Sequence, residues 1–514
     1  MDTRAGRRIS GALAGLLSTA VAVGVGELAA AFVRPAAAPV IAVGNRLIVL
    51  TPESVKRWAI RTFATDDKQT LVTGIYLALA LLGVAVGLVA LKRLVYGLVG
   101  IALLAVVGVY CARTAPGHHS SDIVPAILAV IAGGLTLTRL IGAIGPASVS
   151  REPGRFVLAD RRRFLQGSVT AAGVAALSGV IGRAEQHRHF DVASARSKLA
   201  LPAPAEPAPP LPAGTELGKS GTPWQTPNSQ FYRIDTALAV PQIAPKNWSL
   251  RIHGMVDREI TLTYDQLLAR PLIERWVTLC CVSNYVGGDL IGNARFLGAR
   301  LADVLREAGV HDGADQLLMT SHDGMTIGAP TAVVMDGRDA MIAVGMNGQP
   351  LPVAHGFPAR IVVPGLYGYV SACKWVVDIQ ATTFASRQAY WVVGGWAQQT
   401  DGKLESRIDT PRNGATVAVG TPIAIAGVAW DQHVGVSAVQ IQVDNGPWQQ
   451  ATIAAVPSTD TWRQWVLPWT PPTAGSYVVK VRAVDAAGNP QTEQAADVFP
   501  SGATGLHKIT VRAR

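Results

Sequence analysis

The sequence predicts a multi-domain protein with three parts: an all-α transmembrane bundle of about five helices, an α+β domain and a C-terminal all-β sandwich. Apolar stretches of membrane-crossing length lie before about residue 185. Short alternating strands mixed with a few amphipathic helices follow from about residue 221. From about residue 401 only strand and turn patterns remain. A chain of 514 residues is long enough for three such parts.

The composition excludes a disordered chain and a wholly soluble one. Hydrophobic residues make up 49% of the chain and charged residues only 16%, and the mean hydropathy is +0.27. The formal net charge is +10, which in a membrane protein fixes orientation or attracts anionic head groups. Because no Lys/Arg run is interleaved with aromatic residues, we expect no nucleic-acid partner.

Five apolar stretches are long enough to cross a lipid bilayer. They run over Ile9–Val33, Leu71–Leu91, Leu94–Cys111, Ile123–Ile144 and, with weaker hydropathy, Phe164–Ile181. All ten histidines lie outside these stretches, so the helices are expected to form an anchor and not a membrane haem site.

Basic residues predict the orientation of this bundle. They precede the first stretch (Arg4, Arg7, Arg8), join the second to the third (Lys92, Arg93) and precede the fifth (Arg151, Arg155, Arg161–Arg163). Placing all of them in the cytoplasm satisfies the positive-inside rule. We therefore expect a multi-pass protein of the cell membrane whose domains after about residue 185 are extracytoplasmic.

Two features of the membrane half leave alternatives open. Residues 34–70 would lie outside yet are basic, so Ile41–Phe63 is either an interfacial amphipathic segment or a mis-threaded span. Glu27, in the first span, is either a functional intramembrane carboxylate or a residue that faces the interface.

The segment Asp160–Gln166 reads Asp-Arg-Arg-Arg-Phe-Leu-Gln and precedes a Gly/Ala-rich, weakly apolar stretch. It resembles a twin-arginine export signal placed inside the chain, with the motif at 161–166. The alternative is a basic stop beside a helix. A twin-arginine signal implies that the export machinery carries a folded domain, so that a cofactor can be inserted in the cytoplasm first.

The remaining chain divides by composition into a linker and two domains. Residues 185–220 form a Pro/Ala-rich linker, semi-rigid and extended from Leu201 onward. In the domain of residues 221–400 we expect strands at Trp248–His253 and Arg360–Val363, and helices at Tyr264–Leu268 and Leu301–Ala308.

The domain of residues 401–514 is predicted to be an immunoglobulin-like sandwich. Its length, its strand spacing and turn signals such as Asp444-Asn445-Gly446 are typical of that fold. The expected strands are Thr421–Gly427, Val439–Val443, Arg463–Trp469 and Ser476–Val484.

The four cysteines, Cys111, Cys280, Cys281 and Cys373, are too few for a disulfide framework. Cys280 and Cys281 end an apolar strand, where a thiolate is well placed to bind a soft or high-valent metal. A single cysteine without neighbouring ligands cannot build a zinc site. The pair is either buried packing or the source of one thiolate for a cofactor-bound metal; thiol-redox chemistry is disfavoured by the lack of a Cys-x-x-Cys motif.

Three basic side chains follow in a turn-rich segment that starts at Met346. His355, Arg360 and Lys374 alternate with glycines and prolines and suit a phosphate-bearing ligand. Taken singly, His355 and Arg360 could equally be a polar loop residue and a strand residue with a surface partner.

Together these segments, from about Gly221 to Val511, resemble the sulfite oxidase family of molybdenum enzymes. The resemblance implies a molybdopterin cofactor that carries molybdenum, and an immunoglobulin-like dimerisation domain, hence a possible homodimer. The family's Thr-Leu-x-Cys segment, which supplies the one protein thiolate to molybdenum, matches Thr278–Cys281 and selects Cys281. The cofactor-binding residues implied in the same way are Phe231, Tyr232, Arg233, Asn284, His355, Arg360 and Lys374.

The chain departs from the family at the expected substrate site. Tyr285 and Val286 stand where relatives usually carry arginines, and Val344 stands where many carry a tyrosine. Tyr285 is our candidate for a substrate-facing catalytic residue, with packing as the alternative. Arg295 and Arg300 could supply positive charge instead.

The sequence therefore predicts a membrane-anchored, extracytoplasmic molybdenum oxidoreductase that catalyses two-electron oxygen-atom transfer on a small-molecule substrate. Because no haem-binding module is appended, electrons must be exchanged with a separate carrier. A sulfoxide reductase instead of an oxidase, or an anchored binding or scaffold protein without catalysis, remains an alternative.

Overall fold

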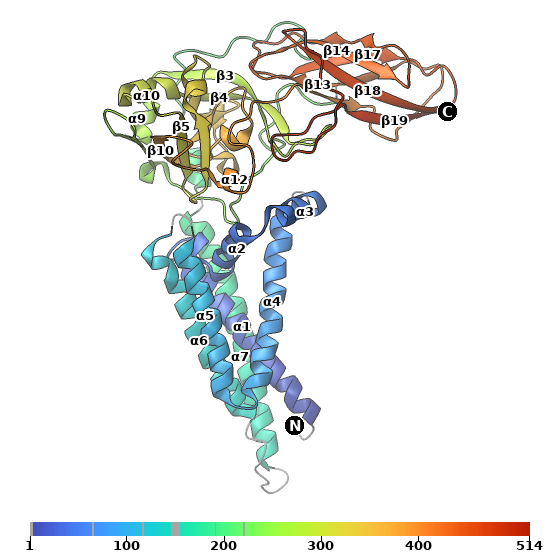
Figure 1. The fold of residues 1–514 in the computed structure, drawn as a ribbon. Helices are drawn as coiled ribbons and strands as arrows, with labels where there is room; N and C mark the ends of the chain where they lie inside the picture. The colour runs from blue at the N-terminus through green and yellow to red at the C-terminus, as the bar shows by residue number, and fades with distance from the viewer. Residues whose placement is uncertain (1–3, 64–65, 116–117, 145–154, 191, 219–220) are drawn as a thin grey trace. The chain divides into compact units, whose positions relative to one another are not determined.

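The computed structural model describes residues 4–63, 66–115, 118–144, 155–190, 192–218 and 221–514. The chain forms two compact units. The helical unit comprises Met1–Val192 and Thr236–Gln242, and the strand-rich unit comprises Ala193–Asp235 and Ile243–Arg514. Figure 1 shows the helical unit in blue to green and the strand-rich unit in green to red.

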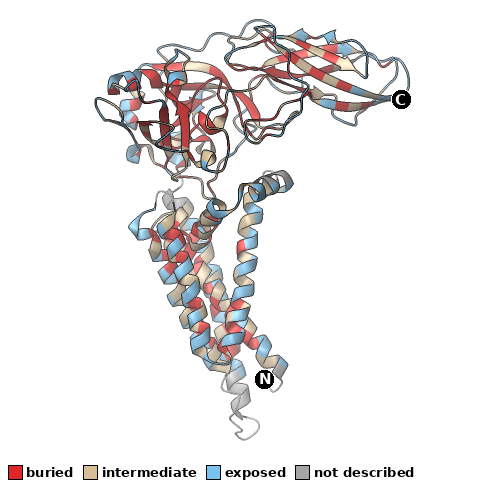
Figure 2. Cartoon of the chain, viewed as in Figure 1, coloured by how far each residue is buried: buried red, intermediate tan, exposed pale blue. Residues whose placement is uncertain are grey.

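Five helices of the helical unit are long and apolar enough to cross a membrane, which confirms the predicted helical bundle. They are α1 (Arg4–Ala30), α4 (Asp67–Ala90), α5 (Leu94–Thr114), α6 (Val124–Ile144) and α7 (Arg155–Phe190). Helix α1 packs against α4, α6 and α7, and the apolar side chains that face away from the bundle are exposed (Figure 2). Small residues permit this packing: a Cβ added to Gly15 of α1 would lie 1.9 Å from the carbonyl oxygen of Gly83 in α4.

The loop of residues 34–70 folds into short helices. These are η1 (Pro35–Ala37), α2 (Pro39–Leu50) and α3 (Glu53–Phe63), and α2 and α3 are both too short to span a bilayer. The structure therefore favours an amphipathic segment over a mis-threaded span for Ile41–Phe63. Arg151 lies outside the described residues, as do the side chains of Arg4 and Arg155.

Glu27 lies between helices and not at the surface of the bundle. Its side chain is 9% exposed and accepts a hydrogen bond from Gln186 Nε2 of α7 at 3.3 Å. The α7 helix therefore covers this carboxylate, whose role stays a prediction.

The α+β domain contains two sheets. One has the order β2-β1-β10-β5-β6, and the other has the order β3-β4-β7-β8 with β9 paired to β7. The strands are β1 (Ser249–Gly254), β2 (Ile260–Thr263), β3 (Leu272–Cys280), β4 (Ile291–Arg300), β5 (Gln316–Ser321), β6 (Thr326–Pro330), β7 (Met341–Met346), β8 (Gln349–Pro350), β9 (Arg360–Val362) and β10 (Val376–Thr382). The helices α9 (Tyr264–Leu268) and α10 (Leu301–Ala308) have the predicted bounds; α11 (Thr331–Met335) and α12 (Tyr390–Val393) were not predicted.

The C-terminal domain is the predicted all-β sandwich, with sheets β11-β13-β17-β16 and β12-β19-β18-β14-β15. Its strands are β11 (Glu405–Thr410), β12 (Thr416–Val417), β13 (Ile423–Trp430), β14 (Val436–Val443), β15 (Gln449–Gln450), β16 (Thr452–Ile453), β17 (Arg463–Trp469), β18 (Gly475–Asp485) and β19 (Lys508–Ala513). Inward-facing residues of both sheets, such as Ile425, Trp465 and Val481, form one core.

The Pro-rich segment is extended, as predicted, but it is not a free linker. Residues 185–190 belong to α7, and α8 (Ala193–Ser197) follows. Beyond α8 the chain lies along β3: the Ala205 N–H donates to Leu272 O and the Glu274 N–H donates to Glu206 O, each at 2.8 Å. Backbone hydrogen bonds outweigh the linker composition here, so this segment belongs to the α+β domain.

Candidate functional site

The loop that follows β3 carries Cys281 at its start; we call residues 281–290 the Cys281 loop. The Cys281 N–H donates to Leu290 O at 2.9 Å, which closes the loop at its base. The side chain of Asn284 accepts a hydrogen bond from the Leu290 N–H at 2.9 Å. Asn284 thus shapes the loop from within, because its amide replaces backbone partners that a tight loop cannot provide.

The two adjacent cysteines have different surroundings. Both are buried free thiols, and burial raises the pKa of each. The Ser283 N–H, 3.5 Å from Cys281 Sγ, and the Lys374 ammonium both oppose that rise at Cys281. At Cys280 the Glu405 carboxyl group and the Cys281 thiol add to the rise, the Arg407 guanidinium opposes it, and the pKa of Cys280 stays well above its ordinary value. Cys281 is therefore the better placed of the two to form a thiolate.

Basic side chains gather beside this loop: Lys374 and Arg360 are largely buried, whereas Arg233 is exposed. Lys374 Nζ donates to Asp235 Oδ2 at 2.6 Å, and Arg233 Nε donates to the same oxygen at 2.9 Å. Arg360 begins β9, and its Nη1 donates to the carbonyl oxygen of His355 at 3.2 Å. His355 itself ends the short helix η5 (Val353–His355).

Burial makes this cationic group costly to keep charged. It lowers the pKa of Lys374 to about 8 and that of Arg360 to about 10. Burial, helped by Arg360 and Lys374, lowers the pKa of His355 to about 4, so His355 is neutral at pH 7. The buried Arg360 Nε has no hydrogen-bond partner within the described part of the chain. An anion bound here would satisfy that donor and repay the desolvation of the two cations.

Aromatic rings border the basic group. Phe231 stacks on Tyr232 with ring centroids 5.3 Å apart and meets the His355 ring edge to face at 5.7 Å. Gly292 of β4 permits this contact, since a Cβ there would lie 2.8 Å from the Phe231 ring. Burial raises the pKa of the Tyr232 phenol, and its electrostatic interaction with the Cys281 sulfur adds to that rise.

Of the predicted site residues, the contacts and electrostatic interactions therefore link Cys281, Asn284, Phe231, Tyr232, Arg233, His355, Arg360 and Lys374. Tyr285 lies on the Cys281 loop, partly exposed, and its carbonyl oxygen accepts the Gly288 N–H at 2.7 Å.

Arg295 and Arg300 do not supply unpaired charge to this site. Arg295 Nε lies 3.1 Å from Glu274 Oε1, and Arg300 pairs with Glu206 and Asp339. The expectation that they replace the missing family arginines is not supported, because carboxylates already neutralise them.

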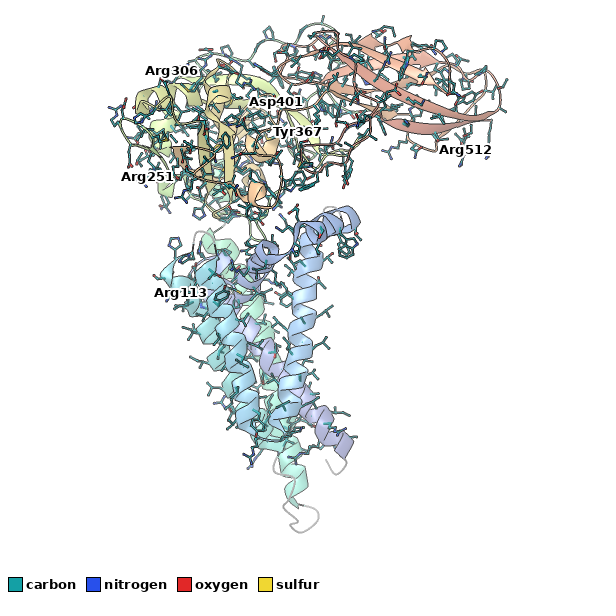
Figure 3. The ribbon with its side chains drawn as sticks, in the orientation of Figure 1. Arg113, Arg251, Arg306, Tyr367, Asp401 and Arg512 are labelled. Atoms are coloured by element: carbon teal, nitrogen blue, oxygen red, sulfur yellow. The ribbon has the colours of Figure 1, made fainter. Side chains whose placement is uncertain are left out.

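Two acidic residues at this site were missed from the sequence. Asp235 binds both Lys374 and Arg233; its position two residues after Arg233 was the available signal. Glu405 lies on the sandwich domain and is 3% exposed; sequence spacing offered no signal for it. Tyr367, labelled in Figure 3, is buried nearby, and the Cys280 thiol and Glu405 add to the rise in its pKa that burial causes. Among the residues that the structure describes, no group of three or more His, Cys, Asp or Glu could hold a metal ion.

The strand-rich part of the chain is similar to known proteins. Residues 237–391 match the model of the oxidoreductase molybdopterin binding domain, and residues 405–481 match the bacterial Ig domain. The chain is 30% identical over 322 residues to sulfite oxidase of Gallus gallus, covering 53% of this chain and 69% of that protein. It is 30% identical over 362 residues to mitochondrial sulfite oxidase of Drosophila melanogaster, covering 59% of this chain but only 62% of the insect protein. The sulfane dehydrogenase SoxCD from Paracoccus pantotrophus is 22% identical with a TM-score of 0.48, covering 56% of this chain and 82% of that chain.

Proposed function

Because the chain belongs to the sulfite oxidase family of molybdopterin-dependent oxidoreductases, we propose that it is a membrane-anchored enzyme that holds molybdopterin-bound molybdenum in its α+β domain. The observation that carries this proposal is one buried thiol, Cys281, beside a buried and incompletely paired cationic group. A metal with a single protein thiolate and a phosphate-bearing organic ligand fits that donor set.

Each residue has a defined role in this proposal. Arg233, Arg360 and Lys374 bind the phosphate-bearing part of the cofactor, and neutral His355 adds a hydrogen bond without charge. Phe231 and Tyr232 form an apolar wall. When bound, molybdenum supplies the two-electron chemistry of oxygen-atom transfer.

The protein keeps Cys281 ready to act as a ligand. A thiol must lose its proton to bind a metal. The Ser283 N–H and the Lys374 ammonium favour the ionised sulfur. Asp235 and the Ala354 carbonyl oxygen hold the proton on Lys374 Nζ, at 2.6 and 3.3 Å. Since Cys281 is 7% exposed, the ligand sulfur is kept from bulk water.

We propose a small-molecule substrate that approaches near Tyr285. Tyr285 and Val286 carry no charge, and Arg295 and Arg300 are paired with carboxylates. This observation favours a substrate of low charge, and hence sulfoxide reduction as a second candidate beside oxidation of sulfite or another small oxyanion.

The remaining assignments are proposals about the cellular setting. The five long apolar helices span the cell membrane, with the strand-rich unit on the extracytoplasmic side and the motif at 161–166 directing twin-arginine export. Electrons are exchanged with a separate carrier, and the sandwich domain supports a homodimer. The positive-inside distribution of Arg and Lys supports this orientation.

Two measurements test the proposed function. Elemental analysis of the full-length protein, matured in a host that makes molybdopterin, should find about one molybdenum per chain. A screen with artificial electron donors and acceptors then separates reduction of sulfoxides from oxidation of sulfite. A chain that stays free of molybdenum under these conditions would support the anchored scaffold instead.

A further inference from the structure

The sandwich domain reaches the Cys281 loop through β11. Arg407 of β11 donates from Nη1 to the carbonyl oxygen of Gly288 at 2.8 Å. The guanidinium also pairs with Asp409, whose Oδ2 accepts the Thr222 hydroxyl at 2.7 Å. Arg407 is 8% exposed, so its bond to the loop is a charge-assisted hydrogen bond shielded from water.

A second sandwich residue covers the neighbouring glycine. A Cβ on Gly287 would lie 2.3 Å from His507 Cδ2, so the imidazole ring lies directly against this glycine. The ring is fixed because His507 Nδ1 accepts the Ile408 N–H at 3.0 Å. Gly287 has φ +78°, which L side chains rarely adopt, so both the backbone and the ring require glycine here.

The same turn is confined from within the loop. A Cβ on Gly288 would lie 2.6 Å from Asn284 Oδ1. Glu405, at the start of β11, lies beside the Asn284 side chain. The Gly287–Gly288 turn is therefore held between Asn284 on one side and Arg407 and His507 on the other.

This turn is linked to the candidate substrate-facing residue. The Gly288 N–H donates to Tyr285 O at 2.7 Å, so one backbone hydrogen bond joins Gly288 to Tyr285. Cys281 is held separately by its own N–H bond to Leu290 O and by β3. Loss of the Arg407 contact should thus disturb Tyr285 more than Cys281.

We propose that Arg407 of the C-terminal sandwich is a positioning residue for the catalytic site of its own chain, which fixes Tyr285 through the Gly287–Gly288 turn. The proposal rests on the proposed function for the role of Tyr285 and of the loop. It adds a role in the same chain to the dimerisation role that the family resemblance implies.

The test uses the full-length chain and approaches the contact from both sides. Arg407→Ala removes the donor from the sandwich, and Gly287→Ala forces the loop away from His507. Arg482→Ala is the matched control: Arg482 lies on β18, where its Nε donates to Gln440 Oε1 at 2.8 Å within the sandwich. Arg407→Lys keeps the charge and can restore one hydrogen bond.

Amide hydrogen exchange of the cofactor-free chain gives the first result. The Gly288 N–H, which donates to Tyr285 O, should exchange at least tenfold faster in Arg407→Ala and Gly287→Ala, and the Cys281 N–H, which donates to Leu290 O, should change less. Neither rate should change in Arg482→Ala. In the enzyme loaded with molybdenum, Arg407→Ala should raise the KM for the substrate, sulfite or a sulfoxide, that the wild type turns over, with little loss of molybdenum. Arg407→Lys should recover part of the change in KM.

Unchanged loop exchange in both variants, with the sandwich still protected, would overturn the proposal. If Arg407→Ala unfolds the sandwich, Gly287→Ala decides alone, since it lies outside that domain. A wild-type chain without molybdenum would contradict the proposed function but leave the exchange result intact, so the two failures are distinguishable.

Discussion

The Thr278 hydroxyl accepts a hydrogen bond from the Trp462 N–H at 2.8 Å and donates its own proton to Asn293 Oδ1 at 3.0 Å. Thr278 lies on β3, three residues before Cys281, and Trp462 precedes β17 of the sandwich. All three residues are buried. One side chain thus joins the strand that leads to the site with the neighbouring strand and the second domain.

Replacement of Thr278 by valine should therefore destabilise the strand-rich unit. The variant keeps the shape but leaves the Trp462 N–H and Asn293 Oδ1 unpaired, which costs about 2–3 kcal/mol. Thermal unfolding should detect the loss, and Thr278→Ser, which keeps the hydroxyl, should remain close to wild type. Equal stability of Thr278→Val and wild type would show that this bond contributes nothing.

Substitutions of the two adjacent cysteines should have opposite effects on turnover. Cys281→Ser replaces a soft donor by a hard one, so turnover should be largely lost while the pterin is retained. Cys280→Ala should keep turnover and lose about 1–2 kcal/mol of stability from a small cavity. Turnover and molybdenum content, measured together, check both. The reverse pattern would assign the ligand to Cys280.

Lys374→Gln should weaken retention of the cofactor. Removal of one charge-assisted donor costs about 1.5–3 kcal/mol, or roughly a tenfold to hundredfold loss of affinity. The control is Lys480→Gln, because Lys480 lies on β18, where its ammonium donates to the Gln442 side chain. This variant should bind the cofactor normally. Pterin and molybdenum per chain are measured after dialysis. Full retention in Lys374→Gln would place the phosphate elsewhere.

The stability of the cofactor-free chain should depend on His355 in acid. Its folded pKa of about 4 lies below the unfolded value of 6.5, because burial disfavours the charged ring. Between these values the unfolded chain binds a proton that the folded chain does not, so stability falls as the pH drops from about 6.5 to 4.

At the acid end this contribution amounts to about 3 kcal/mol. Urea unfolding gives the free energy of unfolding of the wild type and of His355→Gln at each pH in that range. The change with pH in the difference between the two proteins isolates the contribution of His355. Parallel pH profiles of the two proteins would contradict the depressed pKa.

Export should depend on the arginine pair at the start of the fifth span. Replacement of both Arg161 and Arg162 by lysine keeps the charge but removes the twin-arginine motif. The strand-rich unit should then remain protected from protease added to spheroplasts, whereas Arg163→Lys should leave it accessible. Normal export of the double variant would favour a simple basic stop.

Helices and strands that follow from a local hydrophobic pattern were predicted from the sequence. The bounds of α10 follow from its amphipathic spacing and from Gly309, whose left-handed conformation ends the helix. The strand β17 likewise has its predicted bounds. For the basic group, Lys374, Arg360 and His355 were recognised as donors suited to a phosphate-bearing ligand. The position of Asp235 two residues after Arg233 could have indicated their pairing, but nothing in the sequence indicates that Asp235 also pairs with Lys374.

Contacts between distant segments could not be predicted. Arg407 and Gly288 are 119 residues apart, and Thr278 and Trp462 are 184 residues apart. Such pairs depend on how the two domains pack, which neither propensity nor spacing specifies. Arg300 shows the converse: as a cation near a Gly-rich loop it suggests a substrate site, yet Glu206 neutralises it from the Pro-rich segment.

The Pro-rich segment also determines how the strand-rich unit can exist without its helices. β3 is the outermost strand of its sheet, and Ala205 and Glu206 occupy the backbone groups of Leu272 and Glu274 that its first part would otherwise present to solvent. A chain that lacks residues 1–218 would retain every site residue but would leave that strand edge uncovered. Such an edge can pair with the same edge of another copy and cause aggregation. A soluble, monodisperse form of the strand-rich unit should therefore need to include Ala205 and Glu206.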